Sequence, residues 1–319
     1  MTWKHIQKTN FTSIERLADF LQFSQRNRDI LLAKKEFPLN VPLRLAKKMQ
    51  KNTLEDPLFK QYVTTSRELI REKGYWSDPV QDKQFCKTSK LLQKYRGRAL
   101  LICTQACAMH CRFCFRQNFP YAPLQSQFDR EIAYIAGDPT IKEIILSGGD
   151  PLSLSDAYLE DLCKRLSAIS HVQIIRFHTR FLIGIPERIT DGLLSTLPKN
   201  IQIYFAIHIN HPLELDADVV KACKKLQSEG IQLLSQTVLL REINDSIPTL
   251  EELFFSLARI GVIPYYLHQL DPVVGASHFF VEKEKGIALI KELQKGLPGY
   301  AIPKYVEEIP WRFHKTTIC

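Results

Sequence analysis

The sequence predicts an α/β fold in which parallel strands curl into an open, partial (β/α)6 barrel of the TIM-like kind. From about residue 98 onward, short apolar runs suited to buried parallel strands alternate with amphipathic stretches of helical length. Strand–helix alternation favours a parallel sheet with right-handed crossovers. About six such units can be recognised, fewer than the eight of a closed barrel. An ordinary doubly wound sheet is the alternative.

Each unit can be located along the chain. The expected strands are 99–103, 143–146, 172–177, 201–207, 231–240 and 263–268, and a last strand is expected at 300–306. The expected helices are 128–136, 157–169, 189–197, 217–230, 250–261 and 282–297. Cys103 ends the first apolar run, so we expect it to face the core.

Residues 1–92 are predicted to form a helical and irregular extension, 93–297 the barrel, and 298–319 a C-terminal strand and tail. Apolar residues from Ile14 to Leu21 recur at helical spacing behind Thr12 and Ser13, which can cap a helix. Prolines interrupt the extension, so its helices should be short. These prolines are Pro38, Pro42, Pro57 and Pro79.

Composition excludes several protein classes. The 319 residues, 45% of them hydrophobic, suffice for one barrel-sized domain with an added segment. Because no run of about 18 apolar residues exists, no membrane span is expected, and the N-terminus lacks the apolar run of a signal peptide. The eight cysteines are either scattered or set at ligand spacing, which favours a reducing cytoplasm over disulfides.

The net charge of +9 is unevenly distributed. Residues 1–116 hold 23 Lys and Arg against 10 Asp and Glu, whereas residues 117–319 hold 20 against 24. A basic first third can attract nucleic acid or an acidic protein. No aromatic-interleaved RNA-binding motif accompanies the charge, so a solvated face with a few arginines for anionic cofactors is favoured over nucleic acid.

Three cysteines form the pattern C-x3-C-x2-C: Cys107, Cys111 and Cys114. Soft thiolates in so short a loop select an iron–sulfur cluster or zinc. A structural zinc site closes its shell with a fourth ligand, whereas a cluster with three protein ligands leaves one iron open to a substrate or cofactor. A zinc loop and three buried thiols are the alternatives.

The stretch Ser147-Gly148-Gly149-Asp150 ends the second expected strand. Glycines at the carboxyl end of a strand allow a backbone to approach a ligand closely. Asp150 can accept a hydrogen bond from an ammonium group or brace that group. A simple tight turn is the alternative.

Together these motifs resemble the lysine 2,3-aminomutase family of the radical S-adenosylmethionine (SAM) superfamily, over about residues 56–315. The segments that carry the resemblance are 111–116, 147–152, 208–212, 236–241 and 265–271. The chain length and the ending from Pro298 to Lys315 resemble a short bacterial branch. That branch makes (R)-β-lysine for the modification of translation elongation factor P.

The resemblance implies three cofactors: a [4Fe–4S] cluster on Cys107, Cys111 and Cys114, SAM on the open iron, and pyridoxal phosphate (PLP). The implied SAM contacts are Ser147, Gly148, Gly149, Asp150, His208 and Gln236. His208 and Gln236 could instead be hydrogen-bonded interior residues.

Lys315 matches the lysine that holds PLP covalently in this family, Tyr95 matches a tyrosine beside the PLP ring, and Lys94 and Arg98 match the phosphate site. Cations at a phosphate are physically expected. The family carries a glycine run before this lysine, whereas this chain has Pro-Trp-Arg-Phe-His at 310–314. By residue type alone, Lys315 would be a solvated tail lysine.

For the substrate lysine, the resemblance implies Arg116 at the α-carboxylate, a geometry that suits a bidentate fork. Asp271 and Glu308 match the two carboxylates that contact the distal ammonium, with glutamate at 308 where the family has aspartate. The long clostridial-type enzymes carry a C-terminal cysteine cluster for zinc. Only Cys319 stands here, so no structural zinc is expected.

The implied activity is isomerisation of (S)-α-lysine to (R)-β-lysine. The implied partners are an electron donor such as flavodoxin and the β-lysine ligase that modifies elongation factor P. Two alternatives stay open: an aminomutase acting on another amino acid, and a non-catalytic Fe–S module that binds nucleic acid. Asp271 and Glu308 argue against an acidic amino acid because both would repel a side-chain carboxylate.

Overall fold

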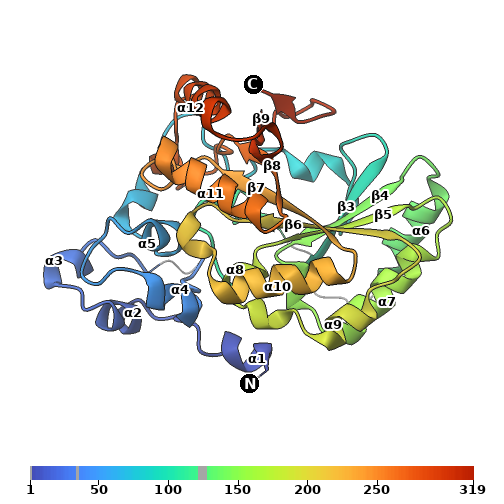
Figure 1. Cartoon of the computed structure of the whole chain (residues 1–319), viewed down its shortest axis with the longest axis horizontal. Helices are drawn as coiled ribbons and strands as arrows, with labels where there is room; N and C mark the ends of the chain where they lie inside the picture. The colour runs from blue at the N-terminus through green and yellow to red at the C-terminus, as the bar shows by residue number, and fades with distance from the viewer. Residues whose placement is uncertain (1, 34–35, 121–127) are drawn as a thin grey trace.

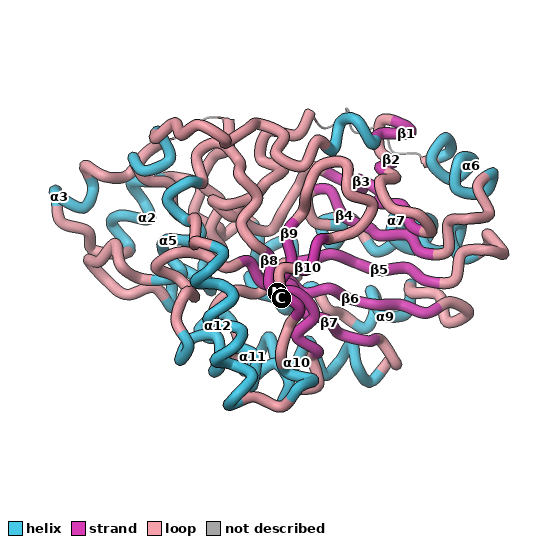
Figure 2. The backbone as a smooth tube through the Cα atoms, turned by 90° about the horizontal axis from the view of Figure 1, so that it is seen from above, coloured by secondary structure: helices cyan, strands magenta, loops and turns pink. Residues whose placement is uncertain are grey.

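The computed structural model describes residues 2–33, 36–120 and 128–319. In this described part, ten strands form one sheet whose spatial order follows the sequence. Strands β3 to β9 run parallel, β1 and β2 extend one edge antiparallel, and β10 extends the other. Figures 1 and 2 show the sheet as a curved, open layer. The predicted α/β fold with a partial barrel is confirmed.

The parallel strands lie close to their expected positions: β3 (Arg98–Thr104), β4 (Glu143–Gly148), β5 (Ile174–Thr179), β6 (Gln202–His208), β7 (Gln232–Val238), β8 (Ile263–His268) and β9 (Lys304–Glu307). The last begins later than expected because a 3-10 turn, η7 (Gly299–Ala301), precedes it. The sequence did not predict β1 (Cys86–Thr88), β2 (Leu91–Leu92) or β10 (Thr316–Thr317), since strands this short show no periodic pattern.

Helices connect the strands and cover the outer face of the sheet (Figure 1): α6 (Asp129–Gly137), α7 (Asp156–Ser167), α8 (Phe181–Gly184), α9 (Asp191–Thr196), α10 (Ala217–Ser228), α11 (Ile247–Arg259) and α12 (Lys283–Gly296). Helix α11 begins earlier than expected because Pro248 lies in its first turn, where a missing N–H is tolerated. Among the described residues, no helix is both long and apolar enough to cross a bilayer.

The N-terminal part contains five short helices: α1 (Trp3–Gln7), α2 (Ile14–Phe20), α3 (Gln25–Arg28), α4 (Leu43–Lys48) and α5 (Pro57–Tyr62). Ser13 caps α2 by accepting a hydrogen bond from the backbone N–H of Arg16. Buried residues from this part, such as Leu17 and Phe59, belong to the same hydrophobic core as Leu146 and Phe177 of the barrel. Cys103 is buried in that core, as expected.

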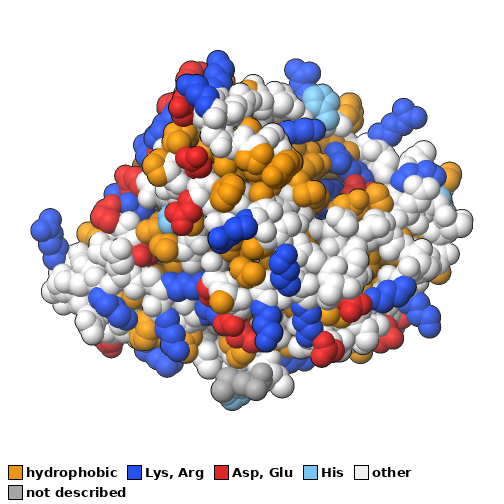
Figure 3. Space-filling view, in the orientation of Figure 1, with side chains coloured by type: hydrophobic (Ala, Val, Ile, Leu, Met, Phe, Trp, Pro, Cys, Tyr) orange, Lys and Arg blue, Asp and Glu red, His pale blue; other side chains and the backbone are white. Residues whose placement is uncertain are grey.

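Basic side chains of the N-terminal part form ion pairs with acidic side chains of the barrel. Arg44 lies 2.7 Å from Glu187 and 2.8 Å from Asp218, and Lys60 lies 2.9 Å from Glu242. Figure 3 shows basic and acidic side chains interspersed on this face. Partly exposed pairs contribute roughly 0–1 kcal/mol each. Their main effect is therefore on the charge distribution: part of the basic excess of residues 1–116 is neutralised within the chain.

A glycine in helix α12 allows a test of how this helix packs on strand β9. A Cβ on Gly286 would lie 2.5 Å from Cε1 of the buried Tyr305 ring. We expect Gly286→Ala to lower the free energy of unfolding by about 1–3 kcal/mol because the core cannot accept the methyl group. Urea denaturation measures this effect.

Gly296→Ala in the same helix is the matched control. The nearest atom to its added Cβ is the carboxylate oxygen of Glu251, at 2.8 Å, which is the end of a flexible side chain. Alanine is favoured over glycine in helices by about 1 kcal/mol, so this variant should be neutral or more stable. Equal stabilisation by both substitutions would contradict the packing of α12 on Tyr305.

Candidate active site

Most of the predicted site residues lie at the rim of the sheet where the parallel strands end. Lys94, Tyr95 and Arg98 instead lie before β3 or at its start, and Lys94 and Tyr95 reach this rim through Glu308. The cysteine loop (residues 107–114) follows β3, and the glycine turn (residues 147–150) closes β4. Asp271 follows β8 and Glu308 follows β9. Loops at the carboxyl ends of parallel strands converge on one side of a sheet, which is where ligands bind in such folds.

The three thiols of the cysteine loop are partly buried and influence one another. Burial raises the pKa of Cys107, and Asp150 and the two other cysteines raise it further. Burial likewise raises the pKa of Cys114 to about 11, and Cys111 adds to the effect. Neighbouring thiolates in this setting need a compensating cation.

This donor set fits a cluster. Within residues 2–33, 36–120 and 128–319, no three ligating side chains converge as they would on a single metal ion. A [4Fe–4S] cluster has several irons to which separate thiolates can bind, so it does not require such convergence.

The N-terminal part holds the backbone of the cysteine loop. The side chain of Asn40 donates to the carbonyl of Cys107 at 3.2 Å, and that of Asn10 donates to the carbonyl of Ala108 at 2.8 Å. The backbone N–H of His110 donates to the carbonyl of Asn40 at 3.0 Å. The loop is therefore shaped by residues far away in the sequence.

A buried ion pair completes this attachment. Arg112 donates from Nε and Nη2 to the two carboxylate oxygens of Glu68, both at 2.7 Å, and the two side chains are 0% and 2% exposed. The backbone N–H of Arg112 also donates to the carbonyl of Gln61 at 2.9 Å. A bidentate pair of this kind fixes both position and orientation.

The glycine turn lies against the segment that leads into the cysteine loop. Gly148 has a φ of +111°, which favours glycine, and a Cβ there would lie 2.7 Å from the carbonyl oxygen of Thr104. The N–H of Gly149 donates to that same carbonyl at 2.6 Å. Only glycine allows the two backbones to approach this closely, as the sequence predicted for this turn.

Asp150 is buried and braces the glycine turn. Its carboxylate accepts from the backbone N–H of Leu152 at 3.0 Å, from the hydroxyl of Thr179 at 2.9 Å and from the backbone N–H of Arg180 at 2.7 Å. Burial raises its pKa to about 6 against these hydrogen bonds. These hydrogen bonds give Asp150 a role that the sequence did not predict, which is to brace the glycine turn.

Four predicted residues meet in one cluster, which we call the Glu308 cluster: Lys94, Tyr95, Glu308 and Lys315. Glu308 accepts hydrogen bonds from Lys94 and Tyr95, and Nζ of Lys315 lies 3.0 Å from its carboxylate. Burial favours protonation of Glu308, but Lys315, Lys94 and Tyr95 outweigh it and lower its pKa. The second predicted ammonium-binding carboxylate is therefore held by this chain's own cations.

Arg98 adjoins the Glu308 cluster. Its guanidinium lies 4.4 Å from the centre of the Tyr95 ring, and its buried Nε has no hydrogen-bond partner among the residues that the structure describes. An amine, an aromatic ring, two further cations and an unused N–H therefore stand together. This donor set fits PLP, with Lys315 as the amine and Lys94 and Arg98 near a phosphate.

The tail reaches this cluster without a glycine run. Trp311 takes a left-handed backbone conformation with a φ of +66°, which is uncommon for a bulky residue. Its ring packs on Phe85 at 5.3 Å between centroids. Beyond this turn, Thr316 pairs with Glu307 in the β9–β10 ladder, which places the preceding Lys315 beside Glu308.

Arg116, which follows the cysteine loop, contacts Asp82 and the glycine turn. Its Nε donates to the carboxylate of Asp82 at 2.7 Å, and Nη1 donates to the hydroxyl of Ser147 at 3.4 Å. Burial raises the pKa of Asp271 to about 7, which the charge of Lys315 opposes. Asp271 therefore lies within the electrostatic field of the Glu308 cluster.

The two remaining predicted residues stand side by side. His208 ends β6 and pairs in register with Gln236 of β7. Burial and the charge of Arg180 lower the pKa of His208 to about 3, so its ring is neutral. Its buried Nε2 has no hydrogen-bond partner within the described residues, which leaves a polar atom suited to a bound ligand.

Two residues of the site were not predicted. Asp82, which pairs with Arg116, lies in a 3-10 turn, η2 (Asp82–Phe85), within the irregular N-terminal part and carries no sequence signal. Arg180 follows β5 directly, and its guanidinium lies 2.8 Å from the sulfur of Cys111. A charged residue at the carboxyl end of an apolar strand is a signal that could have identified it.

Comparisons with known proteins identify the family of this chain. Residues 101–254 match the model of the radical SAM superfamily. The chain is 40% identical to the L-lysine 2,3-aminomutase of Escherichia coli, over 90% of this chain and 84% of that protein. The enzyme of Haemophilus influenzae is 39% identical over 90% and 86%, and that of Clostridium subterminale 31% identical over 99% and 77%. The chain belongs to the L-lysine 2,3-aminomutase family of the radical SAM superfamily.

Proposed function

We propose that this protein isomerises (S)-α-lysine to (R)-β-lysine with a [4Fe–4S] cluster, SAM and PLP. The observation that carries the proposal is the meeting of two donor sets at one rim. One is the three-cysteine loop with the glycine turn, and the other is the Glu308 cluster with Asp271. Arg116 touches the first through Ser147, and its charge acts on Asp271 in the second.

In this proposal, Cys107, Cys111 and Cys114 hold the cluster, and Lys315 holds PLP. The three bound groups supply one-electron reduction, a hydrogen-abstracting radical and an electron-delocalising ring. The chain supplies position and charge. The backbone of Gly148 and Gly149 would contact SAM, as would the side chains of His208 and Gln236. The hydrogen bonds from Asn10 and Asn40 hold the cysteine loop over the rim and help to exclude water.

Substrate lysine needs one cation site and two anion sites. The guanidinium of Arg116 is proposed to bind the α-carboxylate, and the substrate carboxylate then shares or replaces Asp82 as its partner. Asp271 is proposed to accept the distal ammonium. Glu308, which accepts from Lys94 and Lys315, is proposed as a second acceptor that would exchange one of these ammonium partners for that of the substrate.

An acidic substrate is disfavoured, because Asp271 and Glu308 would both repel its side-chain carboxylate. A non-catalytic module that binds nucleic acid is disfavoured as well, because basic residues such as Arg44 and Lys60 are paired with acids of the barrel. Anaerobic incubation of reconstituted protein with L-lysine, SAM, PLP and dithionite tests the proposal. β-Lysine is the expected product. SAM cleavage without formation of β-lysine would refute the proposal that lysine is the substrate.

Removal of Lys315 tests the PLP assignment. We expect Lys315→Ala to keep its iron content and SAM cleavage but to lose the PLP absorbance band and at least about 100-fold of the isomerisation rate, since the covalent anchor is gone. Lys304→Ala, on exposed Lys304 of β9, is the control and should behave as the wild type. Full isomerisation by Lys315→Ala would refute the assignment.

The pKa of Asp271 makes lysine binding depend on pH. Its carboxyl faces Lys315 and Arg116, which favour ionisation, and Glu308 and Asp82, which oppose it together with burial. An ammonium binds the carboxylate rather than the acid, so with a pKa of about 7 the apparent affinity for lysine should rise about tenfold between pH 6 and 8. Asp271→Asn should flatten this profile in a KM measurement.

The raised pKa of Asp271 also makes the stability of the fold depend on pH. Because the folded pKa of Asp271 is raised above its ordinary value, its contribution favours folding at low pH and is lost as the pH rises through about 7. The free energy of unfolding should therefore fall less between pH 6 and 8 in Asp271→Asn than in the wild type. An identical fall in both proteins would contradict the shifted pKa.

A finer proposal concerns the product. The resemblance of residues 298–315 to the short bacterial branch supports a role in supplying (R)-β-lysine for modification of elongation factor P in the cytoplasm. A flavodoxin-like electron donor and the β-lysine ligase are the corresponding partners. Intact-mass analysis of elongation factor P should show the added lysyl mass only in cells that contain this protein. The same mass with and without it would refute this fate of the product while leaving the isomerase proposal intact.

A further inference from the structure

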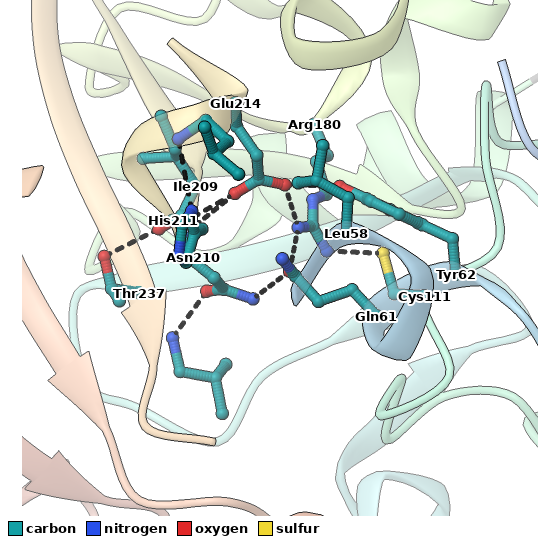
Figure 4. A network of polar contacts seen from close by, with 12 residues as sticks. Leu58, Gln61, Tyr62, Cys111, Arg180, Ile209, Asn210, His211, Glu214 and Thr237 are labelled. Carbon is teal, nitrogen blue, oxygen red and sulfur yellow. Dashed lines mark hydrogen bonds and ion pairs between the residues drawn. The ribbon is translucent and has the colours of Figure 1, made fainter. Parts of the chain in front are cut away.

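A buried arginine outside the proposed machinery points directly at the cysteine loop. Nη1 of Arg180 lies 2.8 Å from the sulfur of Cys111, within hydrogen-bond distance for sulfur (Figure 4). Nη2 of the same guanidinium donates to Gln61 at 2.6 Å and to Glu214 at 2.5 Å. The side chains of Arg180 and Glu214 are 7% and 0% exposed. This contact is not used by any step proposed above.

The orientation of Arg180 is fixed by contacts of its backbone and of its guanidinium. Its backbone N–H donates to Asp150, which ties it to the glycine turn. Its partner Glu214 accepts in addition from the phenol of Tyr62 and from the backbone N–H of Asn210, the latter at 2.6 Å. A guanidinium held in this way cannot turn its fork from the sulfur without leaving a buried charge unpaired.

The chemistry of this contact is specific. A guanidinium stays charged at all working pH values and donates charge-assisted hydrogen bonds. Hydrogen bonds to the sulfurs of an iron–sulfur cluster, and positive charge near it, stabilise the more negative, reduced state and raise its reduction potential. A purely structural ion pair would have no need to direct an N–H at a ligand sulfur.

We propose that Arg180 is a positioning residue that donates a hydrogen bond to the Cys111 sulfur in the loaded enzyme and raises the reduction potential of the cluster. The inference rests on the proposed function, because it requires the cluster on Cys111. The step affected is the transfer of one electron from a low-potential donor to the oxidised [4Fe–4S]2+ cluster, giving [4Fe–4S]+ with no bond made or broken.

The test compares two conservative variants of buried arginines. Arg180→Lys keeps a charge beside Glu214, so the protein should fold, but one ammonium cannot reproduce the fork. Arg188→Lys is the control, because Arg188 is equally buried and donates to backbone carbonyls of Leu152 and Leu154 rather than to a cysteine. Circular dichroism and iron content check both variants.

The readout is the midpoint potential of the reconstituted cluster, measured by dithionite titration under electron paramagnetic resonance. Arg180→Lys should have a more negative potential than the wild type, and Arg188→Lys should match the wild type. Equal potentials in all three proteins would overturn the proposal. So would a folded Arg180→Lys that holds less iron than Arg188→Lys, because Arg180 would then act on assembly.

A measurement on the wild type makes the test independent of any variant. Protein grown with guanidinium-15N arginine should show coupling of a nitrogen-15 nucleus to the reduced cluster in pulsed electron paramagnetic resonance. Absence of that coupling overturns the role of Arg180. Failure of the wild type to assemble any cluster would instead refute the proposed function, so the two ideas fail by different observations.

Discussion

The buried ion pair between Arg180 and Glu214 is the interaction on which the geometry of the rim depends. Breaking such a pair from one side typically costs about 3–5 kcal/mol because the remaining charge is left without compensation. Its two members come from the loops after β5 and β6, and their other partners lie in α5, the glycine turn and the cysteine loop. A displacement of any of these segments therefore disturbs a contact of the pair.

The two carboxylates predicted to bind an ammonium group, Asp271 and Glu308, have pKa values shifted in opposite directions. Glu308 has a lowered pKa because it is surrounded by Lys94, Tyr95 and Lys315. Asp271 has a raised pKa because burial outweighs the charges near it. Environments that push two carboxyl pKa values apart are typical of sites in which the two groups have separate tasks. Glu308 is held by the chain's own cations, whereas the pKa of Asp271 lies near neutral pH.

Local patterns in the sequence were sufficient for the framework of the fold. The period of apolar residues located the strands β3 to β8 and their helices, and the glycine pair marked a close backbone approach. The contacts of the rim were not accessible in this way. The partners of Arg116 and Arg112 are Asp82 and Glu68, which lie in segments without periodicity. Pairings of this kind depend on how the chain is folded back rather than on local spacing.

The C-terminal tail shows how a departure from a family pattern can be accommodated. A glycine run adopts unusual backbone angles freely, and this chain reaches its turn with Trp311 in a left-handed conformation. Such a conformation costs of order 1–3 kcal/mol and persists only where its surroundings enforce it. The tilted ring contact with Phe85, the β9–β10 ladder and the hydrogen bond from Lys315 to Glu308 supply that enforcement. The position of Lys315 is thus set by tertiary contacts rather than by a flexible glycine turn. The same contacts attach the tail to the residues proposed to hold PLP.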